Sequence, residues 1–319
     1  MLFFIYFIAV YALPPPFPIP AGNLPSGSQL PTDLSGVKVV IIGGTRGIGN
    51  ATAWEFHNRG ASVTITTRNL INGGDYGPFT VMELEYGQDK SVEKFVNKYV
   101  KQVGRIPDVL LDMGLTLYGG NILDFKKEDM EYATKMYITD PLLLIKEMLV
   151  HNNVSRPFNI SIAISTTSYG ATTSFLGLYP AGKIAKKDFI RDFAVYQGPK
   201  YYPNVRITGI ACSNVNTTLA LTGYNPSVEM GDPVNVKFLQ VAIMGAKVYG
   251  TDPTIVAKAH LEATTLLTHS NNTIYLVQPS ASGRILSEIL HNIYVNDNTT
   301  QYVIDSREYY TLNGVNMTI

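Results

Sequence analysis

Short apolar runs alternate with helical stretches from residue 37 onward, and this alternation limits the fold more than any other feature. Six runs rich in β-branched residues are typical of buried strands: 37–42, 61–67, 79–84, 107–111, 158–164 and 205–211. Helical spacing lies between several of them, as at 90–103 and in the long stretch 127–151, which Pro141 interrupts. Strands that alternate with helices form right-handed crossovers and a parallel sheet covered on both faces. The sequence therefore predicts one α/β domain with a doubly wound sheet over residues 33–319.

The amino-terminal segment differs from this domain. Residues 2–13 read LFFIYFIAVYAL, without a charge, and PPPFPIP follows at 14–20. A membrane-spanning helix needs about 20 apolar residues, so the run is nearer in length to the apolar region of a signal peptide. We expect residues 1–13 to be a signal peptide or a short membrane anchor, and 14–32 to be a linker rich in Pro, Gly and Ser. An apolar terminus packed on the domain is the alternative.

Composition excludes several classes of protein. The 319 residues carry 25 Lys+Arg and 25 Asp+Glu, so the basic surplus of a nucleic-acid binder is absent. A single cysteine, Cys212, excludes an intrachain disulfide framework. The five histidines show no ligand spacing, so we predict no metal site.

A glycine-rich loop follows the first strand and precedes a helix. It reads Gly-Gly-Thr-Arg-Gly-Ile-Gly over residues 43–49. Glycine permits a tight turn and lets backbone N–H groups approach a pyrophosphate, and the helix start adds the positive end of its dipole. The loop predicts dinucleotide binding on a Rossmann-type sheet, an ordinary glycine-rich turn being the alternative. The residues expected to bind the cofactor here are Gly43, Thr45, Arg46, Gly47, Ile48 and Gly49.

The end of the second strand favours NADP over NAD. An NAD site usually places an acid there, which binds the ribose 2′-hydroxyl. This strand ends in Thr66-Thr67-Arg68, with no acid. Arg68 and the loop residue Arg46 are suited to hold a 2′-phosphate, because a guanidinium pairs with phosphate through two hydrogen bonds. A solvated surface arginine is the alternative at each position.

A Tyr-x-x-x-Lys pattern occurs three times, and its position separates one copy from the others. Only Tyr179/Lys183 follows an apolar strand that ends in a hydroxyl cluster, at residues 165–168, and opens a helical run. A spacing of four places both side chains on one face of a helix. A neighbouring ammonium lowers the pKa of a tyrosine, which can then exchange a proton with a substrate oxygen. We therefore expect Tyr179 and Lys183 to be catalytic.

These motifs resemble the short-chain dehydrogenase/reductase family over roughly residues 33–280. The apolar amino terminus and Arg68 look most like its retinol-dehydrogenase-like branch. The resemblance implies that Tyr179 is the general acid/base, that Lys183 lowers its pKa and holds the nicotinamide ribose, and that Glu85 reads the adenine. Gly114 and Thr217 match further cofactor-binding positions. Family spacing points to Thr166 or Thr167 as the catalytic hydroxyl, with Ser165 and Ser168 close behind.

The chain also departs from the family pattern. The family's Asn-Asn-Ala-Gly is replaced by residues 111–114, which read Leu-Asp-Met-Gly. Its helix asparagine falls at Tyr137, and its Pro-Gly after the sixth strand reads Cys212-Ser213. These changes bear on turnover more than on cofactor binding, so a catalytically weak dinucleotide-binding or scaffolding protein is the alternative.

The leading hypothesis is an NADP-dependent oxidoreductase that interconverts an alcohol and a ketone or aldehyde. Apolar residues at 219–245 would suit a lipophilic small-molecule substrate and equally suit a packed helix. The family resemblance implies a homo-oligomer. Seven Asn-x-Ser/Thr sequons and an NADP requirement together favour association with the endoplasmic reticulum membrane, with the secretory pathway as the alternative.

Overall fold

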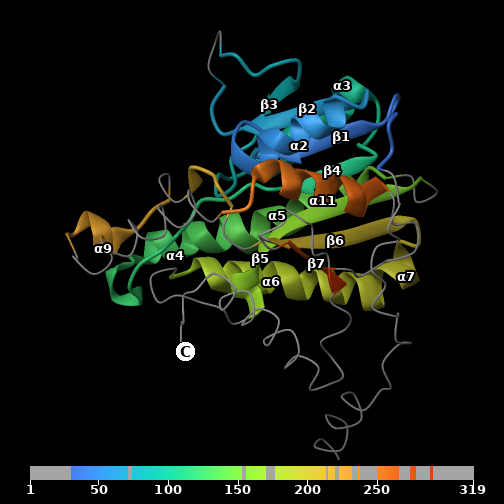
Figure 1. Cartoon of the computed structure of the whole chain (residues 1–319). Coiled ribbons are helices and arrows are strands. Elements are labelled where there is room, and N and C mark those ends of the chain that lie inside the picture. Colours follow the sequence, from blue (N-terminus) through green and yellow to red (C-terminus); the bar gives the residue numbers. More distant parts are fainter. Residues whose placement is uncertain are drawn as a thin grey trace, which may run out of the picture.

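The computed structural model describes residues 30–70, 74–152, 156–169, 177–212, 215–219, 223–231, 236, 250–265, 274–277 and 288–289. In this part of the chain, eight strands form one sheet in the order β3-β2-β1-β4-β5-β6-β7-β8 (Figure 1). All neighbours are parallel except β7 and β8. The strands are β1 (Lys38–Ile42), β2 (Ser62–Thr67), β3 (Thr80–Glu83), β4 (Val109–Asp112), β5 (Phe158–Ser165), β6 (Val205–Cys212), β7 (Ile274–Val277) and β8 (Glu288–Ile289).

Helices connect the strands and cover both faces of the sheet. They are α2 (Gly47–His57), α3 (Ser91–Val103), α4 (Lys127–Thr134), α5 (Asp140–Val150), α6 (Tyr179–Asp192), α7 (Gly198–Tyr201), α9 (Pro226–Glu229) and α11 (Pro253–Thr265). Short 3₁₀ turns lie at Ile122–Asp124 and Thr166–Tyr169, and π-helical turns at Lys135–Thr139 and Phe193–Gln197.

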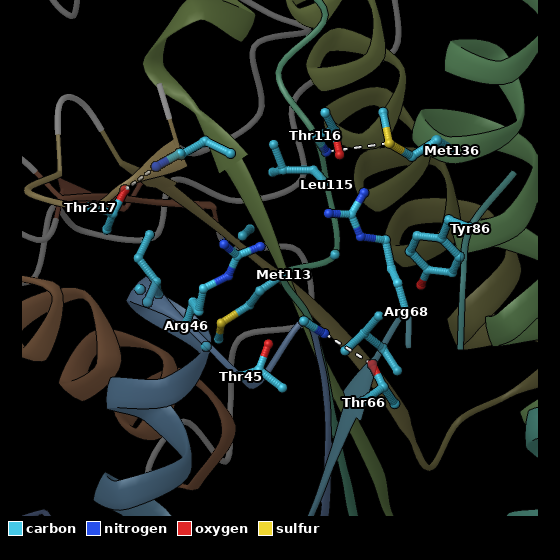
Figure 2. Close-up of a pocket in the computed structure, with 18 of the residues that line it drawn as sticks. Thr45, Arg46, Thr66, Arg68, Tyr86, Met113, Leu115, Thr116, Met136 and Thr217 are labelled. Carbon is cyan, nitrogen blue, oxygen red and sulfur yellow. Dashed lines mark hydrogen bonds between the residues drawn. The ribbon is translucent and has the colours of Figure 1, made fainter. Parts of the chain in front are cut away.

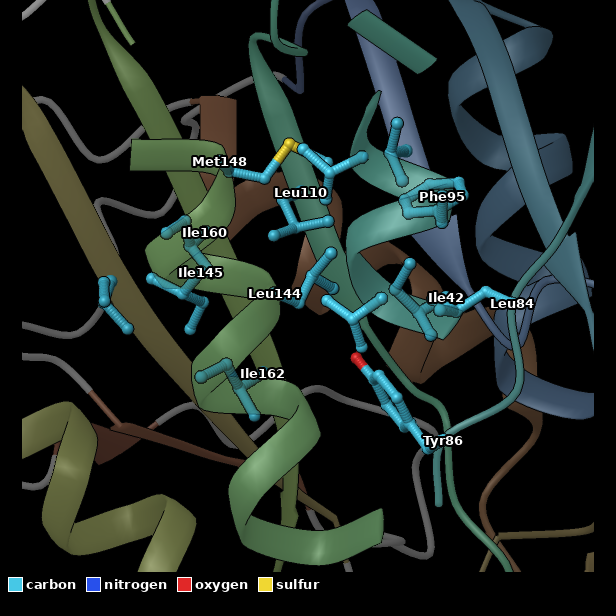
Figure 3. Packing of buried hydrophobic residues seen from close by; sticks show 14 of the residues in the cluster. Ile42, Leu84, Tyr86, Phe95, Leu110, Leu144, Ile145, Met148, Ile160 and Ile162 are labelled. Atoms are coloured by element: carbon cyan, nitrogen blue, oxygen red, sulfur yellow. The ribbon is translucent and has the colours of Figure 1, made fainter. Parts of the chain in front are cut away.

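The two cores follow from the two-residue period of the strands. Val40 and Ile42 of β1 face one core, which α3, α5 and α6 complete, whereas Val39 and Ile41 face the other, which α2 and α11 complete. Figure 3 shows part of the first core, where side chains of α5 interleave with those of β4 and β5. The strands are buried on both sides, and this explains why they read as continuous apolar runs.

The predicted doubly wound α/β fold is confirmed, with all six predicted strands present. β7 and β8 were not predicted. The helical stretch 127–151 departs from regular geometry at 135–139, just before Pro141, which occupies the first turn of α5, where the missing N–H costs little.

Several predictions concern residues outside those described: the signal peptide or anchor at 1–13, most of the linker at 14–32, and most of 219–245. None of the helices in the described part of the chain combines the length and the hydropathy that crossing a bilayer requires.

Candidate active site

A pocket of about 510 Å³ lies where the carboxyl ends of the parallel strands meet (Figure 2). Strand order reverses between β1 and β4, and open α/β sheets bind ligands at such a point. The lining comes from all six of the strand ends that run from β1 to β6. It includes Gly43, Thr45, Arg46, Gly47, Ile48, Gly49, Arg68, Tyr86, Met113, Gly114, Tyr179, Lys183, Cys212 and Thr217.

The glycine positions of the loop have little or no room for a Cβ. A Cβ at Gly49 would lie 2.1 Å from the carbonyl oxygen of Gly43. Gly43 and Gly47 have φ angles of +74° and +54°, a region that favours glycine. The loop is also tied to the next strand, because the Gly43 N–H donates to Thr66 Oγ1 at 3.1 Å. The fold therefore presents backbone and the start of α2 to the pocket, an arrangement suited to a pyrophosphate.

Two arginines line this end of the pocket. Arg46 precedes the first residue of α2, and Arg68 follows β2 directly. Figure 2 shows both guanidinium groups pointing into the pocket from these neighbouring strand ends. Thr217 closes the loop from the other side, since a Cβ on Gly47 would lie 3.2 Å from its methyl carbon. The predicted residues of this end are thus brought together, with one exception.

The exception is Glu85, which is not among the residues lining the pocket. Its backbone N–H donates to Ser91 Oγ at 2.9 Å, at the start of α3. Its charge acts on Tyr132, which does line the pocket and whose pKa is raised first by burial and then by Glu85. The neighbouring Tyr86 lines the pocket in its place.

Tyr179 begins α6 and is 9% exposed. Its hydroxyl is hydrogen-bonded to Ser165, the last residue of β5. Burial raises the pKa of Tyr179, and a close Cys212 adds to this, while the bond with Ser165 acts in the opposite direction. The expected lowering of the Tyr179 pKa is therefore not found in the protein alone, because burial outweighs the effect of its partners.

Lys183 lies one turn along the same helix and is 1% exposed. Its Nζ donates to the carbonyl oxygen of Ala163 at 2.6 Å and lies 5.5 Å from the centre of the Tyr179 ring. Burial and the neighbouring Lys186 lower the pKa of Lys183 to about 7. The predicted pair does share one helix face and one pocket, with Tyr179 protonated and Lys183 close to its titration point at neutral pH.

Within the hydroxyl cluster, Ser165 is hydrogen-bonded to Tyr179. Thr167 is one of the two threonines indicated by family spacing, and its buried Oγ1 has no hydrogen-bond partner among the described residues. The side chain of Thr166 lies outside those described. Ser168 donates to the Ser165 carbonyl at 2.5 Å. Because residues 166–169 turn away as a 3₁₀ helix, the last residue of β5 presents its hydroxyl to Tyr179.

Tyr137 occupies the position of the family's helix asparagine, within the π-helical turn between α4 and α5. Its hydroxyl donates to the carbonyl of Thr116 at 2.5 Å and accepts the N–H of Tyr118 at 3.0 Å. Its ring packs on Gly182 of α6, where a Cβ would lie only 2.4 Å from the ring, and meets Tyr179 edge to face at 6.1 Å. Tyr137, which is larger than an asparagine, thus holds the segment after β4 against α6.

Tyr118 joins several parts of the site through its backbone. Its carbonyl accepts the N–H groups of Leu178 and Tyr179, at 3.1 and 3.3 Å. The same segment pairs with the chain after β6, because Tyr224 N–H donates to Leu117 and Gly119 N–H donates to Tyr224. The start of α6 is therefore held by the segment that follows β4.

Sequence reasoning missed Asp112 and Lys186, which form a buried ion pair below the pocket with 2.7 Å between Nζ and Oδ2. Two features of the sequence pointed to this pair. Asp112 lies in the Leu-Asp-Met-Gly segment that replaces the family's Asn-Asn-Ala-Gly, and Lys186 follows Lys183 by three residues, on the same helix face.

Comparisons with known proteins agree with this geometry. The sequence profile of short chain dehydrogenases matches residues 37–224, more than half of the chain. The chain is 25% identical over 210 residues to the short-chain dehydrogenase/reductase FrzI of a Cladobotryum species, covering 63% of this chain and 79% of that protein. It is 26% identical over 216 residues to glucose and ribitol dehydrogenase homolog 2 of Arabidopsis thaliana, covering 63% and 72%.

Solved structures share the fold at lower identity. Aldohexose dehydrogenase of Thermoplasma acidophilum superposes with a TM-score of 0.63 at 18% identity, covering 80% of this chain and 97% of that chain. RhlG of Pseudomonas aeruginosa, solved as an NADP active-site complex, gives 0.62 at 16% identity, covering 78% and 98%. The chain belongs to the short-chain dehydrogenase family.

Proposed function

We propose that this protein is an NADP-dependent oxidoreductase that interconverts an alcohol and a ketone or aldehyde, with Tyr179 as the general acid/base. The observation that carries the proposal is one pocket that holds both the glycine loop and the Tyr179–Lys183 pair, with Ser165 bonded to the tyrosine. A dinucleotide at the loop and a substrate oxygen at Tyr179 would then share one cavity.

The loop and its arginines fit a nicotinamide dinucleotide phosphate. Gly43, Gly47 and Gly49 leave backbone open to a pyrophosphate, and Arg46 and Arg68 supply two guanidinium groups at the β2 end. No acid stands at that strand end to select the 2′-hydroxyl of NAD. The similar RhlG structure is an NADP complex, and this is in keeping with the choice.

Each residue of the catalytic end has a distinct role in carbonyl reduction. The hydride for the carbonyl carbon would come from NADPH bound at the glycine loop. Tyr179 keeps its proton at neutral pH, because burial raises its pKa, and it donates that proton to the developing alkoxide. Ser165 orients the same oxygen by a hydrogen bond. Lys183, whose pKa is about 7, places positive charge beside the tyrosine ring when it is protonated. Reduction leaves Tyr179 as the phenolate, and alcohol oxidation starts from that phenolate, which then takes the proton of the substrate hydroxyl.

Two measurements test the proposal in sequence. NADPH fluorescence titration reports binding at the glycine loop, and we expect NADPH to bind more tightly than NADH. A panel of ketones and aldehydes, polar and lipophilic, then reports turnover for the wild type and for Tyr179→Phe. We expect the variant to bind NADPH normally and to lose about 10²–10⁴-fold in rate. Equal rates in the two proteins rule out the mechanism.

A catalytically weak dinucleotide-binding or scaffolding protein is the second candidate, favoured by the presence of Asp112 and Tyr137 at altered family positions. It predicts tight NADPH binding without turnover on any substrate of the panel.

We also propose the finer expectations from the sequence: a lipophilic substrate, a homo-oligomer, a likeness to the retinol-dehydrogenase-like branch, and association with the endoplasmic reticulum or the secretory pathway through residues 1–13. Imaging of the full chain and of a variant without residues 1–13 tests the last of these, since loss of the segment should release the protein from membranes.

A further inference from the structure

Two lysines of α6 are buried at the pocket, of which Lys183 lines it. Lys183 and Lys186 are 1% and 3% exposed, and their spacing of three residues places them on one helix face. Burying one ammonium is costly, and burying two in one place is more so, because like charges repel strongly in a poorly solvated site. Such an arrangement requires compensation by nearby groups.

Asp112 at the end of β4 supplies the compensation to Lys186. Its Oδ2 accepts Lys186 Nζ at 2.7 Å, and both side chains are 3% exposed. Its Oδ1 accepts the hydroxyl of Tyr86 and the N–H of Gly114, each at 3.2 Å. Tyr86 and Gly114 both line the pocket, so one carboxylate connects its lining to the catalytic helix.

Among the described residues, no carboxylate is bonded to Lys183. Its Nζ is bonded to the carbonyl of Ala163, a neutral acceptor. The ionisable groups that act on Lys183 come from several elements: Lys186 of α6, Cys212 of β6 and Asp112 of β4. Tyr179 faces it from its own helix, and His260 of α11 also lies within its field. Among the charged groups, Lys186 has a larger effect on Lys183 than Asp112.

We propose that Lys186 is a positioning residue that acts through Lys183: its ion pair with Asp112 holds α6 against the pocket, and its charge sets the electrostatic field at the catalytic lysine. The inference rests on the proposed function for the role of Lys183. Burial lowers the pKa of Lys183 most, and the charge of Lys186 adds to that effect, so that Lys183 changes protonation at a pKa of about 7. The affinity for NADPH and the activity therefore become sensitive to pH in the neutral range.

The first test needs no cofactor. Between pH 7 and the ordinary lysine pKa of 10.5, the unfolded chain holds a proton that native Lys183 has lost, so the free energy of unfolding rises with pH. Urea unfolding from pH 6 to 9 should show this rise beginning near pH 7 in the wild type. In Lys186→Met the rise should begin about 1 pH unit higher, since the like charge is gone while burial, the larger cause, remains. Lys183→Met identifies the contribution of Lys183, because it should lack the rise.

The second test uses NADPH on the same proteins. The logarithm of the dissociation constant, plotted against pH, should bend where Lys183 loses its proton in the free protein. In Lys186→Met the bend should lie at a higher pH, by the same shift as in unfolding. In Lys186→Arg, which keeps the charge, the bend should lie at the same pH as in the wild type. Failure of the wild type to bind NADPH would reject the proposed function, while the unfolding measurement still decides the effect of Lys186 on Lys183.

A paired variant guards against misfolding. Lys186→Met leaves Asp112 buried without its partner, so it could fail to fold. Asp112→Asn/Lys186→Met removes both charges at nearly constant shape. It too should move the pH dependence of unfolding and of NADPH binding to higher pH, because Lys186 affects the pKa of Lys183 more than Asp112 does. The exposed pair Lys127–Glu131, changed to Met and Gln, is the matched control and should move neither. Transitions that stay at the wild-type pH in the folded double variant overturn the proposal.

Discussion

The two ends of the pocket are built by different means. At the cofactor end, formed by residues 42–49 and 66–69, the fold offers backbone, glycines and two arginines at the rim of the pocket. At the catalytic end, formed by the ends of β4, β5 and β6 with α6, it offers buried side chains, among them Asp112, Lys183 and Lys186. The first end depends on residues adjacent in sequence. The second depends on contacts such as Lys186–Asp112, which spans 74 residues. Substitutions at the cofactor end should therefore lower cofactor affinity by crowding the backbone of the loop. Substitutions at the catalytic end should act by changing the charges of buried side chains and the groups that hold a proton.

The largest effect is expected at the cofactor end, from Gly49→Ala. The new Cβ would meet the Gly43 carbonyl at 2.1 Å, so the loop has to move away from its present path. We expect NADPH affinity to fall by about a hundredfold or more, with a lower melting temperature. Gly104→Ala is the control: no described atom lies within 4 Å of an added Cβ there, and its φ of +78° means that the change should lower stability without lowering NADPH affinity. Equal NADPH affinity in the two variants would remove the steric argument.

At the catalytic end, Ser165→Ala should cost turnover without costing cofactor binding. The hydroxyl that contacts Tyr179 is lost, and removal of one hydrogen-bond donor to a developing oxyanion costs about 10²–10³-fold in kcat. Thr167→Ala, two residues on, should stay within about twofold of the wild type, since its Oγ1 has no partner. The reverse order of rates would show that family spacing, and not the observed hydrogen bond, identifies the catalytic hydroxyl.

A smaller effect should follow from Arg46→Gln and Arg68→Gln. Hydrogen bonds to a charged group contribute about 1.5–3 kcal/mol, so each change should lower NADPH affinity by about tenfold or more. NADH affinity should change little, because NADH lacks the 2′-phosphate. Titration with both cofactors yields the ratio directly, and a ratio that both variants leave unchanged would mean that the arginines do not select the cofactor.

The effect that is smallest at neutral pH concerns stability near the catalytic end, and it grows as the pH falls. His260 of α11 is fully buried, with Nδ1 2.9 Å from Ser161 Oγ, and burial lowers its pKa from 6.5 to about 3. Below pH 6.5 the unfolded chain gains a proton that the native protein does not, so stability is complete above pH 6.5 and declines as pH falls toward 3, by at most about 1.4 kcal/mol per pH unit. Urea unfolding at pH 4–7 should show a shallower decline in His260→Gln than in the wild type.

The sequence predicted the cofactor end better than the catalytic end for a physical reason. A loop such as 43–49 carries its geometry in its own glycines, and Arg46 and Arg68 lie next to strand ends that apolar runs reveal. Tyr179 and Lys183 were found because they share one helix turn. Family spacing placed the hydroxyl that contacts Tyr179 one or two residues after Ser165, and the 3₁₀ turn at residues 166–169 was not foreseen. The Asp112–Lys186 pair depends on the order of the strands in the sheet, which no local sequence pattern encodes. The two-residue strand β8 is too short to show a period.

Tyr118 and its neighbours couple the start of α6 to the chain around Tyr224. Through its carbonyl and its neighbours Leu117 and Gly119, the start of α6 and the chain around Tyr224 are attached to one short segment. A molecule that restrains residues 223–225 also reduces the freedom of Tyr179, and a molecule that engages Tyr179 stabilises the attachment at Tyr224 to the same degree, because such coupling is reciprocal. Under the proposed function, a substrate whose distant part contacts Tyr224 would therefore also place its reacting oxygen better, and a truncated substrate should react more slowly even where its carbonyl is unchanged.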